Sequence, residues 1–497
     1  MVDRQLHKHG LLALALAVGL LAGFVFTDRL RVAAQTTGPA MLVPQLGVRA
    51  VATGLNQPTT IAFIGENDML VLEKATGKVQ RVVNGAVAAT VLDLAVNFAS
   101  ERGLLGVALH PDFPDNPGVY LYWTESTSGF DSNTLAETRL LGNRVDRYTW
   151  DGSMLTFDRN LIQLRALQPE FLAGGTIQET SRGNHDGGVM AFGPDGKLYI
   201  FIGDVGRRGW LQNLRDGPLG PGQPDDQFGG PEADDAHLTG AILRLNDDGS
   251  TPTDNPFFAA GAALGGDVGE NIQKLFSYGH RNSFGMAIDV APRGAGNVWL
   301  QENGDDSFSE LNRVIPGMNG GWIQIMGPAE RIGQYKEIET TFGGRSLQQA
   351  RWPPTDIADT AAEALSRLFM LPGATYSDPQ FSWRWEVAPG GMNFLSSDAL
   401  GRQFEGDLFM GAATPVLAGG YLFHFNLSGN RRDIGVEDPR LEDRVADNLA
   451  KHEITESESL LIGRDFGVTT DIETGPNGNL YVVSISNGAI YEVFRER

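Results

Sequence analysis

Residues 189–204 read VMAFGPDGKLYIFIGD, and this stretch is the basis for predicting the fold. An apolar run, a Gly-Pro-Asp-Gly turn and a second apolar-aromatic run follow one another without interruption. Two short apolar runs that flank a turn of this composition predict a β-hairpin. Because a hairpin returns the chain to its starting level, residues just before the first strand and just after the second should lie side by side.

The same two-strand unit occurs six times along the chain. The copies span residues 60–72, 106–122, 189–202, 285–300, 392–410 and 471–483. Six all-β units without a helical repeat between them predict a six-bladed β-propeller. Their uneven spacing predicts long inter-strand loop insertions, and residues 46–51 are expected to supply the outer strand that closes the last blade. The alternatives are a pair of β-sandwiches or two unrelated β domains.

The composition is typical of a large globular β protein. The chain has 497 residues, 41% of them hydrophobic, with 63 glycines and 25 prolines, which suits many short strands and turns. The net charge of −22 argues against a nucleic-acid-binding protein, because that class needs a basic surface. The absence of cysteine excludes disulfides, zinc–thiolate sites, iron–sulfur clusters and attached c-type haem. Redox chemistry would therefore require an organic cofactor or a metal without thiolate ligands.

The N-terminal segment predicts export. Two basic residues precede an apolar run over residues 10–26, and the small residues that a signal peptidase requires follow at 32–34. Residues 1–35 are therefore interpreted as a signal peptide, or as an N-terminal membrane anchor if the segment is not cleaved. The remaining domain, residues 46–497, is expected in the periplasm or outside the cell.

A histidine and an aspartate flank the hairpin of residues 189–204. His185 lies among small residues shortly before its first strand, and Asp204 ends its second strand. A carboxylate beside an imidazole fixes the tautomer and increases the basicity of the ring, as a general base requires. His185 and Asp204 are therefore candidate catalytic residues. The alternative is a structural loop histidine that is bonded to backbone.

Two further segments place polar side chains around the fourth unit. Arg281 and Asn282 precede this unit as His185 precedes the third, and equivalent positions in a propeller converge on the central axis. Residues 302–312, ENGDDSFSELN, follow the unit. They supply carboxylates, an amide and backbone carbonyls that the glycine leaves accessible. Such hard oxygen donors suit Ca²⁺. A hydrogen-bonded acidic turn is the alternative interpretation of this segment.

Together these residues resemble the glucose/sorbosone dehydrogenase family, the soluble aldose sugar dehydrogenases that depend on pyrroloquinoline quinone (PQQ). The similarity runs from about residue 46 to the C-terminus. The matching motifs are GLLGVALHPDF (103–113), NH (184–185) with Asp204, ILRLNDDG (242–249) running to DNPF (254–257), YGHRN (278–282), ELN (310–312) and GPNGNLY (475–481). The resemblance implies a six-bladed propeller with PQQ across its mouth and Ca²⁺ bound to PQQ.

The resemblance also implies roles for individual residues. His185 matches the family's catalytic base, which takes the proton from the anomeric hydroxyl while hydride passes to PQQ, and Asp204 matches the carboxylate that supports it. The quinone would carry the redox chemistry, while the protein supplies orientation, a base and electrostatics. The implied PQQ contacts are Glu101, Arg281 and Asn282, and the implied metal site comprises Gly304 and Asp305, through backbone carbonyls, together with Glu310.

Several positions depart from the family's pattern. PQQ carries three carboxylates, yet the family's final-blade arginine pair falls on Val468 and Thr470, and the lysine of some members falls near Thr414. Ser309 stands where members usually have Asp. Burying an unpaired carboxylate costs several kcal/mol, so the PQQ affinity should be weakened unless other cations reach in. The candidate replacement cations are Arg102, Arg182, Arg207 and Arg464.

We therefore expect a PQQ- and Ca²⁺-dependent oxidoreductase that oxidises an aldose at C1 to a lactone. Its electrons would pass to an external acceptor, a soluble cytochrome or a quinone. The main alternative is a Ca²⁺-binding propeller without PQQ, which acts as a carbohydrate- or protein-binding module or as a lactonase-like hydrolase. A scaffold propeller with a decayed site is a third interpretation.

Overall fold

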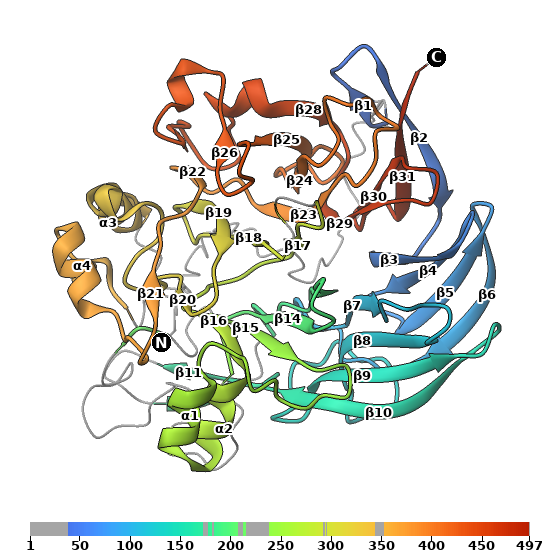
Figure 1. Ribbon diagram of the computed structural model, residues 1–497, viewed down its shortest axis with the longest axis horizontal. Helices are drawn as coiled ribbons and strands as arrows, with labels where there is room; N and C mark the ends of the chain where they lie inside the picture. The colour runs from blue at the N-terminus through green and yellow to red at the C-terminus, as the bar shows by residue number, and fades with distance from the viewer. Residues whose placement is uncertain are drawn as a thin grey trace, which may run out of the picture.

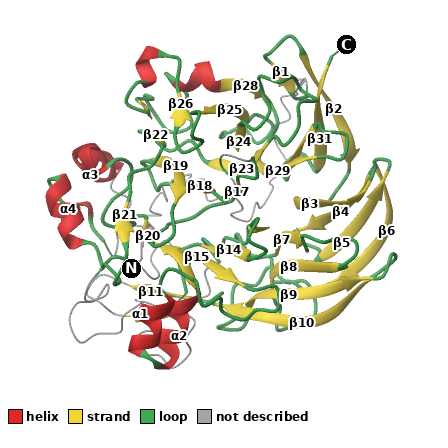
Figure 2. Cartoon of the chain, viewed as in Figure 1, coloured by secondary structure: helices red, strands yellow, loops and turns green. Residues whose placement is uncertain are grey.

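The computed structural model describes residues 38–171, 177–180, 183–206, 212–214, 238–291, 294, 296–342 and 352–496. Within these residues the chain is built mainly from strands, and its short helices lie in the segments that connect them (Figure 2). No helix of the described part is long and apolar enough to cross a membrane. The predicted export segment, residues 1–35, lies outside the described residues.

The described strands form six sheets of four or more strands and one separate hairpin. The first sheet contains β3 (Pro58–Gly65), β4 (Asp68–Glu73), β5 (Lys78–Val83) and β6 (Ala86–Asp93). The second contains β7 (Leu104–Leu109), β8 (Gly118–Thr124), β9 (Asn143–Trp150) and β10 (Leu155–Leu164). The third contains β13 (Met190–Phe192), β14 (Leu198–Ile202), β15 (Ala241–Leu245), β16 (Leu275–Tyr278), β20 (Met318–Asn319) and β21 (Thr375–Tyr376).

The remaining three sheets complete the chain in the same order. The fourth contains β17 (Met286–Ile288), β18 (Val298–Glu302), β19 (Ser309–Val314), β22 (Phe381–Trp383) and β27 (Val445–Ala446). The fifth contains β23 (Pro389–Phe394), β24 (Leu408–Ala412), β25 (Tyr421–Leu427), β28 (Leu461–Arg464), β1 (Ala40–Met41) and β26 (Ile434–Gly435). The sixth contains β29 (Thr469–Thr474), β30 (Leu480–Ser484), β31 (Ala489–Arg495) and β2 (Leu46–Thr53).

The innermost strands of these sheets close into a ring. β3 contacts β7, β7 contacts β13, and the series continues through β17, β23 and β29 back to β3. The sheets are arranged around a common centre (Figure 1). β2, near the N-terminus, pairs with β31, near the C-terminus, so that Leu46 lies opposite Arg495. The predicted all-β propeller is therefore confirmed, and so is the closing strand predicted at residues 46–51.

All six predicted two-strand units form antiparallel hairpins. In the hairpin of β13 and β14, Met190 lies opposite Ile200 and Phe192 opposite Leu198. Every residue of β14 is buried. A strand that neighbouring sheets cover on both faces carries apolar residues at consecutive positions, and this explains the unbroken apolar runs of the sequence.

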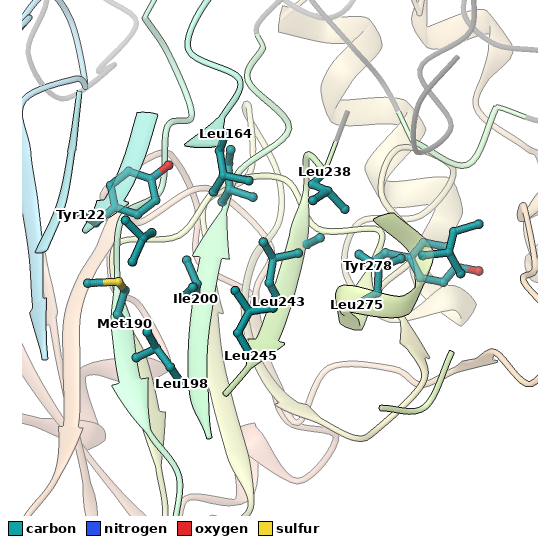
Figure 3. Close-up of a cluster of buried hydrophobic side chains, with 14 of the residues drawn as sticks. Tyr122, Leu164, Met190, Leu198, Ile200, Leu238, Leu243, Leu245, Leu275 and Tyr278 are labelled. Carbon is teal, nitrogen blue, oxygen red and sulfur yellow. The ribbon is translucent and has the colours of Figure 1, made fainter. Parts of the chain in front are cut away.

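Apolar side chains fill the space between neighbouring sheets. Figure 3 shows one such cluster, in which Tyr122 and Leu164 of the second sheet join Met190 and Ile200 of the third. Each large side chain that is buried in this way contributes roughly 1.5–3 kcal/mol. The hydroxyl of Tyr122 also donates to the carbonyl oxygen of Asp186 at 2.8 Å. The loop that carries His185 is therefore anchored to the second sheet.

Insertions between strands account for the uneven spacing of the units. The helices are α1 (Phe258–Leu264), α2 (Gly266–Lys274), α3 (Ile332–Phe342) and α4 (Ala361–Arg367), and the 3₁₀ helices span Ala329–Arg331, Pro354–Asp356, Pro439–Leu441 and Ser457–Leu460. β11 (Gln168–Phe171) and β12 (Ile177–Thr180) form the separate hairpin. α4 begins where the Thr360 hydroxyl oxygen accepts the backbone N–H of Glu363, a typical N-cap.

Candidate active site

His185 and Asp204 lie in contact at one rim of the third sheet, as the hairpin predicts. His185 precedes β13, and Asp204 follows β14. Nδ1 of His185 lies 2.5 Å from Oδ1 of Asp204, and both residues are buried. The backbone of His185 has a φ of 59°, which is uncommon for a residue with a side chain. Such local strain is found most often where function requires one particular side-chain placement.

The Asp204 carboxylate is held at both oxygens. The indole Nε1–H of Trp322 donates to Oδ2 at 2.8 Å, and the backbone N–H of Gly206 donates to Oδ1 at 2.9 Å. Trp322 is only 2% exposed. Since the carboxylate accepts hydrogen bonds, Nδ1 of His185 carries the ring proton and Nε2 is left as the basic nitrogen.

Glu101 connects the His185 loop to the fourth sheet. Its Oε2 accepts the backbone N–H of His185 at 2.7 Å and the side-chain amide of Asn282 at 3.1 Å. Its own backbone N–H donates to the carbonyl oxygen of Gly183 at 2.7 Å. The structure therefore brings Glu101, Asn282 and His185 together, as the predicted set of site residues requires.

Arg281 lies between this group and the acidic segment of residues 302–312. Its Nη1 donates to the carbonyl oxygen of Asn303 at 2.7 Å, and its Nη2 lies 3.5 Å from Oδ1 of Asp305. The guanidinium also lies 5.4 Å from the centre of the Trp322 ring, within range of a cation–π interaction. Burial lowers the pKa of Arg281, but the surrounding carboxylates, Asp305 first, raise it above its ordinary value.

Two buried polar atoms at this site have no hydrogen-bond partner among the described residues. They are Nε of Arg281 and Oδ1 of Asn282, one donor and one acceptor. Buried polar atoms are rarely left without a partner, because the loss of hydration costs about 1–3 kcal/mol. The pair therefore fits a polar ligand that offers both an acceptor and a donor.

Glu339 and Lys451 bind the acidic segment from other parts of the chain. Glu339 accepts the backbone N–H groups of Asp306 and Ser307 at 3.2 and 3.1 Å. Lys451 donates from Nζ to the carbonyl oxygen of Asp305 at 2.6 Å and to Oδ1 of Asp306 at 2.8 Å. The oxygen donors of this segment suit a hard cation, and the chain's own ammonium already contacts two of them.

Glu386 lies beside Ser309. The hydroxyl of Ser309 donates to Oε2 of Glu386 at 2.8 Å. Burial raises the pKa of Glu386 to about 7, although Lys451, Ser309 and Arg281 act in the opposite direction. A carboxylate therefore lies beside the position at which Ser309 departs from the family's pattern.

Glu310, a predicted metal ligand, is satisfied within the protein. Its Oε2 accepts the side-chain amide of Asn312 at 2.9 Å, and its Oε1 accepts the backbone N–H of Gly327. Burial, with the neighbouring Glu302, raises the pKa of Glu310 to about 8. Within the described residues, no three His, Asp or Glu side chains are grouped so that they could hold a metal ion. Side chains alone therefore do not form a metal site there.

The two predicted replacement cations that the structure describes are engaged elsewhere. The guanidinium of Arg102 donates to the carbonyl oxygens of Ala166 at 3.1 Å and Leu135 at 2.7 Å. Arg464 is exposed on β28, beside Asp465. The two others, Arg182 and Arg207, lie outside the described residues.

A cavity of about 290 Å³ lies among the inner strands beneath Glu101. Val468 and Thr470 line it, as do Glu101 and Lys74. Nζ of Lys74 donates to two backbone carbonyls, and burial lowers its pKa to about 7 against the opposing effect of Glu101. The hydroxyl of Thr414 donates to the carbonyl oxygen of Val416. The positions of the family's cations are thus neutral here.

Comparison with known proteins identifies the family. A model of the family named glucose/sorbosone dehydrogenase matches residues 55–358. The chain belongs to this family. It is 30% identical over 286 residues to quinoprotein glucose dehydrogenase B of Acinetobacter calcoaceticus, a match that covers 56% of this chain and 52% of that protein. The chain therefore matches about half the length of this relative.

A second relative and two solved structures match over more of their length. Aldose sugar dehydrogenase YliI of Escherichia coli is 24% identical over 453 residues, which cover 90% of this chain and 92% of that protein. The apo form of the soluble aldose sugar dehydrogenase from Escherichia coli has a TM-score of 0.57 at 22% identity and covers 91% of this chain and 100% of its own. The PQQ-bound aldose sugar dehydrogenase of Streptomyces coelicolor has a TM-score of 0.52 at 23% identity and covers 91% and 98%. The two structures share the propeller fold.

The site also contains residues that the sequence did not identify as functional. Trp322 packs in a buried apolar cluster, and its indole also donates to Asp204. Glu386, Glu339 and Lys451 come from segments outside every matching motif. Their contacts join positions far apart in the chain, so no local pattern of residues pointed to them.

Proposed function

We propose that this chain is a PQQ- and Ca²⁺-dependent sugar dehydrogenase that oxidises an aldose at C1 to a lactone and passes the electrons to an external acceptor. The observation that carries the proposal is the buried contact between His185 and Asp204 beside Arg281 and Asn282. Membership of the glucose/sorbosone dehydrogenase family supports the reaction class, and the names of the relatives support the quinone and the sugar.

The described residues fit the quinone through their hydrogen-bonding atoms. Arg281 and Asn282 would hold it, because each has one buried polar atom that lacks a hydrogen-bond partner in the described part of the chain. Glu101 would fix Asn282 and the His185 backbone at the correct separation. When bound, PQQ supplies a quinone that accepts two electrons. Ca²⁺ would meet the oxygen donors around Asp305, which are of the kind this ion prefers.

His185 and Asp204 perform the proton chemistry in this proposal. Asp204 keeps the proton on Nδ1, so Nε2 of His185 takes the proton from the C1 hydroxyl of the sugar. The Asp204 carboxylate then stabilises the positive charge that develops on the imidazole. The hydrogen bonds from Trp322 and Gly206 keep Asp204 oriented, so little reorganisation is needed during proton transfer.

The proposal extends to the whole molecule. Each of the six sheets would be one blade of a six-bladed propeller formed by residues 46–497. Residues 1–35 would direct export to the periplasm or beyond, or would anchor the protein. A soluble cytochrome or a quinone would receive the electrons, since the sequence has no haem attachment motif.

A second candidate is a propeller that binds Ca²⁺ but not PQQ, and that acts as a binding module or as a lactonase-like hydrolase. One observation favours it: Val468, Thr470 and Thr414 leave the family's cation positions neutral. An unpaired buried carboxylate of PQQ would cost several kcal/mol. The retained His185 and Arg281 favour the dehydrogenase.

The two candidates are separated by reconstitution. The EDTA-treated protein is titrated with PQQ in the presence of Ca²⁺, and dye reduction is then followed with a panel of aldoses. Saturable binding with sugar-dependent turnover supports the dehydrogenase. The absence of binding at micromolar PQQ would overturn the redox proposal and favour the second candidate.

A matched pair of histidine variants tests the role of His185. His185→Gln should keep PQQ binding and lose turnover. His424 on β25 provides the control, because its Nε2 lies 2.8 Å from Oδ2 of Asp407, a histidine–aspartate pair outside the site that is more exposed than His185–Asp204. His424→Gln should keep both binding and turnover. Equal turnover of the two variants would show that His185 is not the base.

A further inference from the structure

The segment Lys451–His452 reaches the acidic segment from a different part of the chain. It lies between β27 and the 3₁₀ helix Ser457–Leu460, whereas Asp305 and Asp306 lie between β18 and β19. The Lys451 side chain is 23% exposed, and Nζ lies 2.6 Å from the carbonyl oxygen of Asp305 and 2.8 Å from Oδ1 of Asp306. One ammonium group therefore binds a backbone oxygen and a carboxylate oxygen at once.

The backbone around Lys451 is fixed. The N–H of His452 donates to the carbonyl oxygen of Glu386 at 2.7 Å, and the side chain of Asn448 accepts the backbone N–H of Trp385 at 2.8 Å. The N–H of Glu386 in turn donates to the carbonyl oxygen of Asp306 at 3.1 Å. Since both segments are tied to the same stretch of chain, the ammonium is positioned by the fold.

The charges around Asp305 explain why a cation is needed there. Asp305, Asp306, Glu339 and Glu386 are all buried and come together at the end of the fourth sheet. Arg281 approaches Asp305 from one side, with Nη2 at 3.5 Å from Oδ1. Lys451 approaches the carbonyl oxygen of the same residue. Two cations from the described residues therefore approach Asp305, while burial raises the pKa of Glu339 and of Glu386.

We propose that Lys451 is a built-in cation that occupies the position on the Asp305 carbonyl which a divalent cation would otherwise take. A lysine ammonium and Ca²⁺ cannot both contact this oxygen closely, because two positive charges a few ångströms apart repel strongly in a buried site. Ca²⁺ binding at Asp305 therefore requires displacement of Lys451. The inference concerns cation binding alone and needs neither PQQ nor a sugar.

Calorimetric titration with CaCl₂ tests the inference on EDTA-treated protein without PQQ. Lys451→Met should bind Ca²⁺ at least about tenfold more tightly than the wild type, because the competing charge is gone. Lys451→Arg keeps the positive charge and should stay closer to the wild type than Lys451→Met does. Lys336→Met is the control, since the Lys336 side chain is 26% exposed and its Nζ pairs with Oδ1 of Asp359 at 2.6 Å instead of with Asp305 or Asp306. It should also stay close to the wild type.

Equal Ca²⁺ affinity of Lys451→Met and the wild type would overturn the inference. A second measurement on the wild type keeps the test independent of any variant. Lysine acetylation by acetic anhydride, read by mass spectrometry, should increase at Lys451 when Ca²⁺ is added and stay constant at Lys336. Unchanged labelling of Lys451 at Ca²⁺ concentrations that give a calorimetric binding signal would also overturn it. Failure of PQQ binding alters neither result.

Discussion

The substitution Trp322→Phe removes the indole donor to Asp204 and keeps an aromatic ring at the same place. The hydrogen bond measures 2.8 Å, the indole is 2% exposed and the carboxylate is fully buried. A hydrogen bond to a charged group contributes about 1.5–3 kcal/mol, and its loss leaves Oδ2 of Asp204 buried with one donor fewer. We therefore expect the free energy of unfolding to fall by that amount, in addition to the effect of the smaller ring.

The effect of the smaller ring is measured with Trp299→Phe. Trp299 is fully buried, and its Nε1 has no hydrogen-bond partner among the described residues. The same atoms are removed there without the loss of a hydrogen bond. The difference between the two variants in urea unfolding, followed by circular dichroism, should therefore isolate the Trp322–Asp204 bond, at about 1.5–3 kcal/mol.

Turnover provides the second measurement for this pair. If Trp322 keeps Asp204 oriented for His185, Trp322→Phe should lower kcat by about tenfold or more, which corresponds to about 1.4 kcal/mol. Trp299→Phe should leave kcat near the wild-type value. Equal stability losses and equal kcat values in the two variants would refute a positioning role for Trp322.

Three further predictions concern pH, packing and charge. Burial raises the pKa of Asp186 from 3.8 to about 7. Its contribution to the free energy of unfolding is therefore fully present below pH 3.8 and is lost as the pH rises through 7. Asp186→Asn should lack this decline when unfolding is measured as a function of pH. In Gly106→Ala the new Cβ would lie 2.0 Å from the carbonyl oxygen of Gly188, so urea unfolding should show a loss of about 1–3 kcal/mol. Ser309→Asp would place a second carboxylate against Glu386, 2.8 Å from the present hydroxyl, and should lower the melting temperature, while the double variant with Glu386→Ser should restore it.

Each of these predictions has an outcome that contradicts it. Parallel stability curves of the wild type and Asp186→Asn between pH 4 and 7 would mean that Asp186 is ionised throughout. An unchanged stability of Gly106→Ala would mean that the inner strands can separate without cost. A Ser309→Asp protein as stable as the wild type would mean that Glu386 does not lie against the substituted side chain.

The sequence predicted those parts of the fold and of the site that depend on residues close to one another in the chain. Each hairpin is specified by two apolar runs and one turn, and the pair His185–Asp204 follows because one hairpin separates its members by 19 residues. Arg281 and Asn282 were found because they precede the fourth hairpin as His185 precedes the third. Because the units repeat, residues at equivalent positions of different units lie near one another around the mouth of the propeller.

The contacts that the sequence could not predict join different units. Trp322 lies 118 residues from Asp204, Lys451 lies 146 residues from Asp305, and Glu386 lies 77 residues from Ser309. Each contributes a side chain from an insertion or a strand end whose direction depends on tertiary packing. Glu310 was predicted as a metal ligand from its place in a matching motif; each of its oxygens accepts one hydrogen bond from the protein, and its role as a ligand stays a prediction.

The serine at position 309, where family members usually have aspartate, shows that charges should be compared over the whole site and not position by position. A carboxylate that is absent at Ser309 has a neighbour in Glu386, which comes from a different part of the chain. The loss of positive charge at Val468 and Thr470 therefore has to be compared with the net charge of all side chains around the mouth. There, Arg281 and Lys451 are paired with Asp305 and Asp306, and burial raises the pKa of Glu339 and Glu386, so an anionic ligand would meet no excess of positive charge. If PQQ and Ca²⁺ bind as proposed, the cation would lower the electrostatic cost of binding the anionic cofactor, so the two binding events should be positively coupled.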